Sequence, residues 1–391
     1  MRRFLCIAAG LLAMSAHAQL ANIDKSASPF TFQAGSVYND AINPSYLGGS
    51  EGYGVSLEAN GTLVSTQESV WWQFDYGAAY DRYQLQEEQL DFDESQDFYA
   101  YNVRIQSRAF VHEAFTVDVV AEHRKSEQKY GEGISRFQNN VLSIDTLSRN
   151  RAEIIAVYGR DPNHNSITAE LFWQKDSYDD VNPYASLFDL SQQGALAQVK
   201  LMVAGKIGFL ARVSITDDDY ESNERVDSRL YNALVGIDWT LSGKSSLRVL
   251  LGGFQRDAED GQDRSGFSWD VSYDYSPSDY QAISLTTKRT SAVSEVAFSS
   301  SSVDVTHGFN WRYAIDEIWF WQANMSWLEK DINADDLTRT LEQFDAGFTL
   351  GYNLRSFSHI MLGVTRRDVS SSDNTVDYAQ NEVRLSWLYE F

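Results

Sequence analysis

The stretch Asn381–Phe391, which reads NEVRLSWLYEF, alternates apolar and polar residues with a period of two. One face carries Val383, Leu385, Trp387, Tyr389 and Phe391. The other face carries Glu382, Arg384, Ser386 and Glu390. Successive side chains of a β-strand point to opposite faces, so this pattern predicts a strand that separates an apolar from a polar environment.

The same alternation recurs in segments of about 10–14 residues through almost the whole chain after residue 28. The connections between these segments alternate in length. Tight turns are expected near 65–67, 111–113, 161–163, 205–206, 241–243, 276–278, 314–316 and 354–356. Longer polar loops are expected at 39–51, 84–96, 127–149, 179–191, 218–227, 258–264, 292–300, 331–338 and 370–377.

Regular alternation of tight turns and long loops is typical of an outer-membrane barrel, whose tight turns face the periplasm. We therefore predict an all-β fold, a transmembrane antiparallel up-and-down β-barrel over residues 30–391, in the bacterial outer membrane. The pattern indicates about 18 strands, within a range of about 16–20, because segment 127–149 is long enough to hold a further strand pair. The alternative is a secreted sandwich or propeller, but no blade-length repeat is visible and so many exposed aromatic faces would aggregate in water.

Composition excludes several other classes of protein. Aromatic residues make up 13% of the 391 residues, yet the mean hydropathy is −0.38. Large rings in a polar chain suit strands with one apolar face. The formal net charge of −23 argues against a nucleic-acid-binding protein, which needs a basic surface. Past the N-terminus no apolar run approaches the ~20 residues of a membrane-spanning helix, so a helical membrane protein is excluded.

The N-terminus has the three parts of a secretory signal peptide. Arg2 and Arg3 form the charged start, Phe4–Met14 is apolar, and Ala16–Ala18 is an A-x-A cleavage site. We predict a signal peptide over residues 1–18 and a short periplasmic segment over 19–29. Cys6, the single cysteine, falls inside the signal, so the mature chain is expected to contain no disulfide.

Aromatic residues near the predicted strand ends indicate membrane girdles. Those close to tight turns, which predict the periplasmic girdle, are Trp239, Tyr275, Tyr313, Tyr352 and Tyr389. Trp327 precedes a predicted long loop and is expected in the outer girdle.

The polar faces of the strands predict the lining of the barrel lumen. Its acidic candidates are Glu58, Asp75, Asp118, Glu122, Asp238, Asp270, Asp274, Asp304 and Glu382. Its basic candidates are Arg104, Arg108, Arg124, Lys200, Arg212, Lys288, Arg312, Arg367 and Arg384. A wall with both signs can hold ion pairs and still leave a wet passage, because a barrel of this size encloses a channel unless it is plugged. Whether these charges brace the wall or contact a solute stays open.

Excess negative charge lies mainly in the predicted loops, for example at 87–97, 217–221 and 257–263. Clustered carboxylates can bind Ca²⁺ or Mg²⁺. The stretch from Asp257 to Asp263 lacks the spacing of an EF-hand loop, so we predict a solvated acidic rim with no metal site and no other cofactor. An acidic mouth favours neutral or cationic solutes over polyanions.

The histidines give one enzymatic alternative. His307 has the lipid-facing register and follows the serine run Ser299–Ser302, and a lipid-facing Ser/His pair could act on phospholipid. No sequence feature fixes the serine or an orienting partner, and no phosphate loop, zinc pattern or dinucleotide fingerprint is present. We predict that the chain is not an enzyme.

Hairpins in the region Tyr231–Arg289 carry a family resemblance. They read YNALVGIDWTLSGKSSLRVLLGGFQRDAED from residue 231 and GFSWDVSYDYSPSDYQAISLTTKR from residue 266. Their rhythm and hairpin style, which extend over most of the mature chain, resemble a family of outer-membrane β-barrel porins associated with exopolysaccharide biosynthesis and export. The resemblance implies a channel that passes exopolysaccharide or another hydrophilic solute, with polysaccharide export components as partners. It includes no catalytic or binding motif.

The terminal Phe391, at the end of an alternating strand, resembles the C-terminal signal that the barrel-assembly machinery recognises in bacterial outer-membrane proteins. Outer-membrane lipid and lipopolysaccharide are further expected partners, and nucleic acid is not one. Two alternatives to polymer export stay open. A general or sugar-selective diffusion porin would be favoured by inward folding of loop 127–149, and a non-conducting structural or surface-binding barrel would have its lumen closed by ion pairs.

Overall fold

The computed structural model describes residues 29–47, 49–67, 69–86, 95–137, 144–159, 164–179, 182, 184–222, 224–259, 263–296, 299, 301–334 and 337–391. The predicted signal peptide (1–18), and all but the last residue of the predicted periplasmic segment (19–29), lie outside the described residues. Within the described ranges, no helix combines the length and the apolar character needed to cross a membrane.

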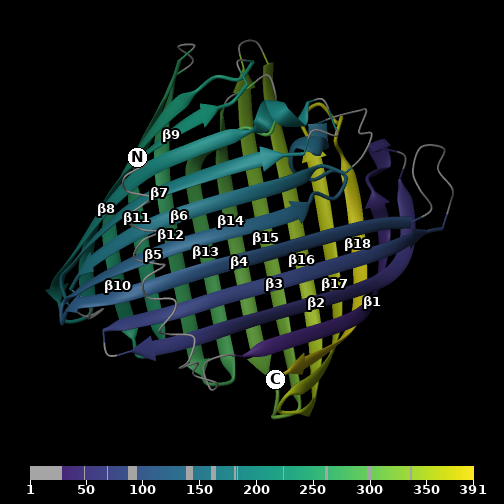
Figure 1. The fold of residues 1–391 in the computed structure, drawn as a ribbon, viewed down its shortest axis with the longest axis horizontal. Coiled ribbons are helices and arrows are strands. Elements are labelled where there is room, and N and C mark those ends of the chain that lie inside the picture. Colours follow the sequence, from purple (N-terminus) through teal and green to yellow (C-terminus); the bar gives the residue numbers. More distant parts are fainter. Residues whose placement is uncertain are drawn as a thin grey trace.

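Eighteen antiparallel strands form one sheet that closes into a barrel (Figure 1). The strands are β1 (Phe30–Asn43), β2 (Ser50–Gln67), β3 (Val70–Leu85), β4 (Ser95–His112), β5 (Phe115–Glu127), β6 (Thr146–Tyr158), β7 (Ser166–Tyr178), β8 (Leu190–Ala204), β9 (Ile207–Tyr220), β10 (Ser228–Ser242), β11 (Ser245–Ala258), β12 (Arg264–Ser278), β13 (Gln281–Val293), β14 (Ser301–Ala314), β15 (Trp319–Ala334), β16 (Leu337–Arg355), β17 (Ser358–Ser371) and β18 (Tyr378–Glu390). Short 3-10 turns, η2 (Ser45–Leu47), η3 (Gly133–Phe137) and η4 (Ala185–Phe188), lie in the described connections. The predicted antiparallel barrel and its strand number are confirmed.

Pairing between the first and last strands closes the sheet. β1 runs antiparallel to β18, from Thr31 opposite Glu390 to Asn39 opposite Glu382. Its other edge pairs with β2. The sheet therefore has no free edge, which is the condition for a strand protein to lie in hydrocarbon.

The connections distinguish the two ends of the barrel. Short turns such as 205–206 and 243–244 lie at the end where β1 begins and β18 finishes, which we call the turn end. Longer connections such as 128–145 and 179–189 lie at the opposite end, the loop end. Barrels of this type place short turns in the periplasm and long loops outside the cell.

Some strands extend further than the hydropathy pattern predicted. The loop expected at 331–338 is much shorter, because β15 continues to Ala334 and β16 begins at Leu337. Trp327 was expected beside the following loop, but it lies in the middle of β15. The stretch 331–338 reads DINADDLT, so polar residues occupy both faces and the alternation with a period of two is lost. The backbone pairing between β15 and β16 nevertheless continues to Ala334 and Leu337.

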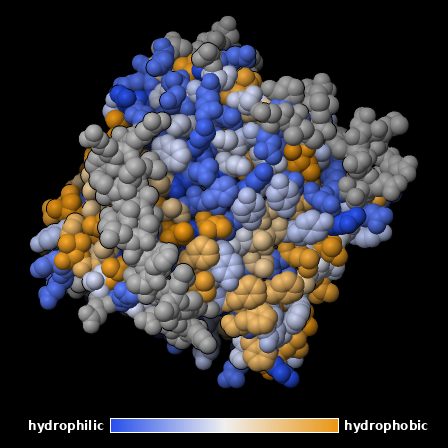
Figure 2. Space-filling model, in the orientation of Figure 1, coloured by the Kyte–Doolittle hydropathy of each residue, from blue (hydrophilic) through white to orange (hydrophobic). Residues whose placement is uncertain are grey.

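The outer face of the barrel is largely apolar. Exposed side chains on this face include Val55 and Leu57 of β2, Val213 of β9, Val235 of β10 and Leu385 of β18. Figure 2 shows hydrophobic side chains gathered on the lower part of the visible face, with hydrophilic ones concentrated toward the upper part. An apolar belt of this kind suits hydrocarbon and would be a liability in water.

Aromatic rings cluster on the outer face near the turn end. Trp311 packs edge-on against Trp321 with ring centroids 4.4 Å apart, and Tyr313 lies 6.0 Å from Trp321. Trp319 packs against Tyr352 at 4.7 Å. Of the other predicted girdle residues, Trp239, Tyr275 and Tyr389 also lie in the last few residues of their strands at this end.

A second aromatic cluster covers the seam between β1 and β18. The backbone N–H of Phe391 donates to the carbonyl of Phe30 at 2.7 Å. The Phe391 ring lies 5.3 Å from that of Phe30 and 4.4 Å from that of Tyr389. The last residue of the chain thus joins both strands of the seam.

Replacing Phe391 by Ala is expected to lower the free energy of unfolding by about 1–2 kcal/mol, because two ring contacts at the seam are lost. Urea denaturation in detergent micelles, followed by tryptophan fluorescence, measures the effect. Phe267→Ala, which truncates an exposed ring away from the seam, is the control. Equal losses in the two variants would contradict a special role for the seam contact.

Candidate functional site

The strand register places all the predicted lumen residues on one face of the sheet. Asp75 stands opposite Arg104, which in turn stands opposite Glu122. The same relation continues around the barrel through pairs such as Asp270 and Lys288. Residues directly opposite on paired strands share a face, so this polar face is continuous.

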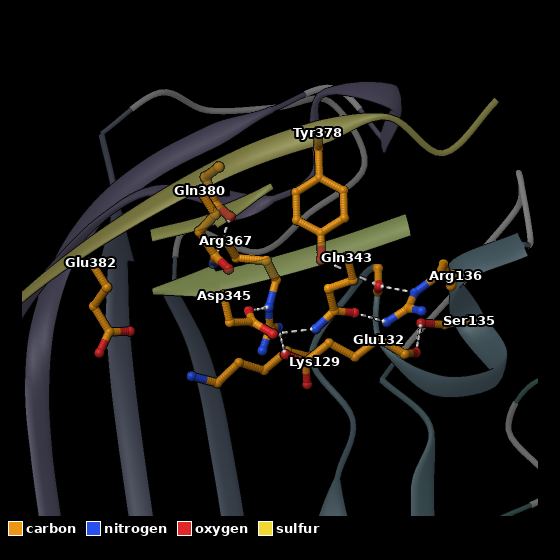
Figure 3. A network of polar contacts seen from close by, with 12 residues as sticks. Lys129, Glu132, Ser135, Arg136, Gln343, Asp345, Arg367, Tyr378, Gln380 and Glu382 are labelled. Atoms are coloured by element: carbon orange, nitrogen blue, oxygen red, sulfur yellow. Dashed lines mark hydrogen bonds and ion pairs between the residues drawn. The ribbon is translucent and has the colours of Figure 1, made fainter. Parts of the chain in front are cut away.

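A chain segment contacts this polar face from several sides, which shows that the face lines the interior. Residues 128–137, which follow β5 and which we call the inner segment, leave the wall and cross the interior. Lys129 Nζ lies 3.4 Å from Asp81 Oδ2 on β3. On distant strands, Glu132 forms an ion pair with Arg367 of β17, and Arg136 donates to Gln343 of β16 at 3.0 Å (Figure 3).

Two glycines allow the inner segment to fold back on itself. Gly131 has φ +77°, and a Cβ there would lie 2.4 Å from Pro44 Cγ. Gly133 has φ +56°, also in the left-handed region that side chains rarely adopt. Between them Glu132 accepts a hydrogen bond from Ser135 Oγ through its backbone carbonyl, at 2.8 Å. Arg136 Nε donates to the carbonyl of Gly131 at 3.1 Å, which closes the turn.

Apolar contacts anchor the inner segment at the loop end. Ile134 is buried against Ala185 and Phe188, which belong to the connection between β7 and β8. Phe137 packs against a second cluster, which contains Leu341 and Val369. These contacts exclude water from one side of the segment and leave its charged side facing the lumen.

A partly buried ion cluster ties the inner segment to the connection between β13 and β14. Glu295 Oε1 accepts from Lys330 Nζ at 2.9 Å, and its other oxygen lies 3.9 Å from Arg136. Lys330 also lies 3.9 Å from Asp304, one of the predicted lumen residues. Burial alone would raise the pKa of the Glu295 carboxyl, but Lys330 and Arg136 outweigh it and hold that pKa below its ordinary value.

Most of the predicted lumen charges are paired within the wall. Bidentate hydrogen bonds join Arg108 to Asp118 at 2.7 and 2.8 Å. Further pairs are Arg104–Asp75 at 3.4 Å, Lys200–Asp238 at 2.6 Å, Arg212–Asp270 at 2.9 Å, Arg367–Asp345 at 2.7 Å and Arg384–Glu382 at 2.9 Å. Three of these pairs join neighbouring strands, Lys200–Asp238 and Arg212–Asp270 join strands further apart in the sheet, and Arg384–Glu382 lies within β18.

The remaining predicted lumen residues lack an ionic partner within the described part of the chain. Glu58 accepts a hydrogen bond from Asn60 at 2.7 Å, and the Arg312 guanidinium lies 5.8 Å from the centre of the Phe320 ring. The side chains without either an ion pair or a hydrogen bond to a described residue are those of Glu122, Arg124, Asp274, Lys288 and Arg312. These charges are free to meet water or a solute.

The interior is filled at the loop end and open at the turn end. Arg256 forms an ion pair with Asp218 there, and their side chains are only 2% and 0% exposed. Toward the turn end, by contrast, the inward residues Asp274 and Arg312 are exposed, as is Lys288 near the middle of β13. The connections of the loop end therefore narrow the lumen, and the inner segment forms part of that constriction.

Polar cavities remain beside the inner segment. One of about 260 Å³ is lined by Lys129, Glu132 and Arg367, together with residues of β15, β16 and β18. A second of about 340 Å³ lies on the other side of Glu132, toward Arg124 and Arg149. A third of about 240 Å³ continues from Arg124 along the wall formed by β2 to β5. Cavities with polar lining thus adjoin the segment on both sides.

Sequence patterns missed the residues that hold the inner segment. Lys129, Glu132 and Arg136 lie in a connection without periodicity, so no pattern links them to their partners. The close pair Gly131 and Gly133 was the one local signal, since it indicates a tight fold of the chain.

The alternative of a lipid-facing Ser/His pair finds no geometric support in the described residues. His307 lies on the outer face, where it lines an apolar groove with Trp327 and Phe344. Ser299, Ser301 and Ser302 are buried, and Ser302 Oγ donates to Asp304 at 2.5 Å. Of the acidic stretches, 87–94 lies outside the described residues, and the described residues contain no cluster of His, Cys, Asp or Glu suited to a metal ion.

No protein-family model and no curated protein matches the chain. Among solved structures it is similar to the FrpB iron transporter of Neisseria meningitidis, at 7% identity and a TM-score of 0.50 over 96% of this chain and 83% of that one. It is also similar to Pseudomonas aeruginosa OpdK, solved with vanillate, at 9% identity and a TM-score of 0.46 over 94% and 99% of the two chains. At such identity the likeness to FrpB shows the fold alone, that of an outer-membrane β-barrel.

Attachment of the inner segment is expected to weaken in acid. Because the pKa of Glu295 is lowered in the folded protein, its ion pairs stabilise the fold above the ordinary carboxyl pKa of about 4.3 and are lost as the pH falls through the lowered value. Hydrogen exchange of residues 131–137, corrected for the intrinsic rate, should accelerate as the pH falls below about 4.3.

Glu295→Gln should show the faster exchange already at pH 7 and lose most of this pH dependence. Glu317→Gln, at the turn end, is the matched control and should behave as the unmodified protein does. Unchanged exchange in Glu295→Gln would show that the carboxylate does not hold the segment.

Proposed function

We propose that the protein is a passive channel that lets small hydrophilic solutes diffuse across the outer membrane, with the inner segment as its constriction. The observation that carries this proposal is the crossing of the lumen by residues 128–137, held to β17 through Glu132 and Arg367. A loop folded into the lumen reduces the passage without removing its polar lining. The wall supplies hydrogen bonds in place of solute hydration, so no covalent chemistry is needed.

The dimensions of the free space support a small solute. The cavities beside the inner segment, of about 260 and 340 Å³, are at or below the lower end of the range for drug-sized ligands. Both are lined by side chains of both charge signs. A neutral or dipolar solute can replace water in these cavities, because the positive and negative side chains of the lining compensate one another.

Exopolysaccharide export, which the family resemblance implies, is the second candidate. A polymer would need a continuous passage as wide as a sugar ring, and the inner segment crosses that path. Export would therefore require the segment to leave the lumen, at the cost of its contacts with Gln343, Arg367 and Glu295. The geometry favours the small-solute channel over the export channel for this reason.

Lipid and assembly partners follow from the outer face. We propose that outer-membrane lipid and lipopolysaccharide cover the apolar belt, and that the barrel-assembly machinery recognises the strand ending in Phe391. The exposed Phe391 ring at the seam supports the second proposal, because it remains accessible next to the closing strand pair.

Loosening the inner segment is expected to enlarge the channel. Arg367→Gln removes the cation that Glu132 and Asp345 share, so the segment loses its contact with β17. Single-channel conductance in planar bilayers should rise about 2-fold or more, with frequent switching between levels, because such ion pairs near water contribute on the order of 1 kcal/mol.

Arg366→Gln is the matched control for this measurement, since Arg366 pairs with Asp368 and points to the outer face. It should conduct as the unmodified channel does. Absence of any conductance in the unmodified protein would instead support the non-conducting barrel. Equal conductance in all three proteins would show that the inner segment does not limit conductance.

Solute size separates the two transport functions. Proteoliposome swelling should be rapid with monosaccharides and fall steeply for trisaccharides, because the solute must pass beside the inner segment. In the source bacterium, deletion of the gene should leave secreted polysaccharide unchanged. Loss of secreted polymer would favour export.

A further inference from the structure

We propose that the recess between β2 and β5 is a binding site for a small solute that carries both a carboxylate and an ammonium group, with Arg124 and Glu122 as its binding residues. This inference rests on the proposed channel function and names a solute class for it. The recess is the cavity of about 240 Å³ on the inner wall. Through Arg124 and Ala100 it adjoins the cavity of about 340 Å³ beside the inner segment, so it lies along the route of a solute.

Small residues on the inner face create the recess. Ala79 of β3 stands opposite Glu58 of β2 and Ala100 of β4, so two neighbouring strands offer only a methyl group at this level. At the next level Gly77 lies between Asn60 and Asn102, and their side-chain oxygens would come within 2.4 and 2.6 Å of a Cβ at Gly77. Small residues therefore form the base of the recess, and polar side chains surround it.

Arg124 carries a charge that the wall does not neutralise. It stands directly opposite Arg149 of β6 and Asn102 of β4. Arg149 is held by Asp176 through two hydrogen bonds of 2.8 and 2.7 Å, whereas the exposed Arg124 side chain forms no ion pair of 4.0 Å or less with a described carboxylate. Like charges in directly opposite positions destabilise a sheet, so the wall by itself gains nothing from this arginine.

Glu122 and Arg124 stay apart although their spacing allows an ion pair. Both point inward from β5, two residues apart. Side chains at this spacing pair elsewhere in the barrel: Arg384 with Glu382 at 2.9 Å, Arg366 with Asp368 at 2.7 Å, and Arg151 with Glu153. No ion pair of 4.0 Å or less joins Glu122 to Arg124. Both charges line the recess without neutralising each other in an ion pair.

The charges around the recess select a solute with both signs. A carboxylate can take bidentate hydrogen bonds from the Arg124 guanidinium, and an ammonium group can donate to Glu122 or Glu58. A simple anion would have to sit close to two carboxylates, and a simple cation close to the guanidinium. An amino-acid-like solute avoids both repulsions and is small enough for the volume.

Binding to the full chain in detergent micelles tests the proposal with L-alanine and two analogues that each lack one of its charged groups. L-alanine carries both charges, propionate lacks the ammonium group, and ethylammonium lacks the carboxylate. In saturation-transfer NMR titrations, L-alanine should bind about 10-fold more tightly than either analogue, as expected for one additional charge-assisted hydrogen bond.

Charge-neutral variants assign the two binding roles. Arg124→Gln should weaken L-alanine binding about 10-fold and make it equal to that of ethylammonium. Glu122→Gln should make L-alanine equal to propionate. Lys288→Gln, which removes an inward cation of β13 outside the recess, is the matched control and should leave all three affinities unchanged. Should a charge variant fail to fold, Ala79→Leu fills the recess without changing charge and should abolish the preference.

Two results would overturn the proposal. One is that L-alanine binds no more tightly than its single-charge analogues. The other is that Lys288→Gln weakens binding as much as Arg124→Gln. Conductance measured on the same preparation tests the channel function independently of the binding site. A conducting channel without the L-alanine preference would refute the binding site and leave the channel function standing, whereas a non-conducting barrel would refute the channel function whatever it binds.

Discussion

A strand in hydrocarbon has no water to satisfy its backbone N–H and C=O groups, so the sheet must close on itself. In this barrel the closing contact is the pairing of β1 with β18, which ends where the Phe391 N–H meets the Phe30 carbonyl. Closure also separates two solvents, because each strand then faces lipid on one side and an enclosed polar space on the other. The alternation of side chains along every strand follows from that separation.

The enclosed space imposes its own demand, since inward charges must be paired, hydrated or covered. At the loop end they are covered: Arg256 and Asp218 form a buried ion pair beneath the connections. Loss of one member of such a pair typically costs about 3–5 kcal/mol, because the other charge stays buried without a partner. Further toward the turn end the inward charges of Lys288 and Arg312 are exposed, so water can hydrate them. The polar wall is therefore compatible with an interior that is filled at the loop end and hydrated toward the turn end.

Local alternation was sufficient to predict the strand number and the outward faces, because each depends on neighbours in the sequence. It failed where polar residues occupy both faces, as in the hairpin of β15 and β16, whose ladder continues through Asp331 and Thr340. The length of loop 127–149 raised its inward folding as one alternative, but the alternation could not predict the contacts that hold the inner segment. Glu132 and Arg367 are far apart in the sequence, and no periodicity expresses a contact across an enclosed space. The candidates on the inner wall could be chosen from the sequence, whereas their pairing could not.

The two sides of the inner segment are held by different forces, and this difference bears on how the constriction can respond to a solute. Ile134 and Phe137 anchor it through apolar packing, which needs no particular charge and persists in salt. Glu132 is held by an ion pair with Arg367 beside a polar cavity, and because both side chains are partly exposed, screening leaves such a pair weak. Charged groups of a passing solute can compete for Arg367 or Glu132 without disturbing the apolar anchors. The lumen-facing side can therefore yield while the segment stays attached, so the effective width of the passage depends on the charge of what enters it.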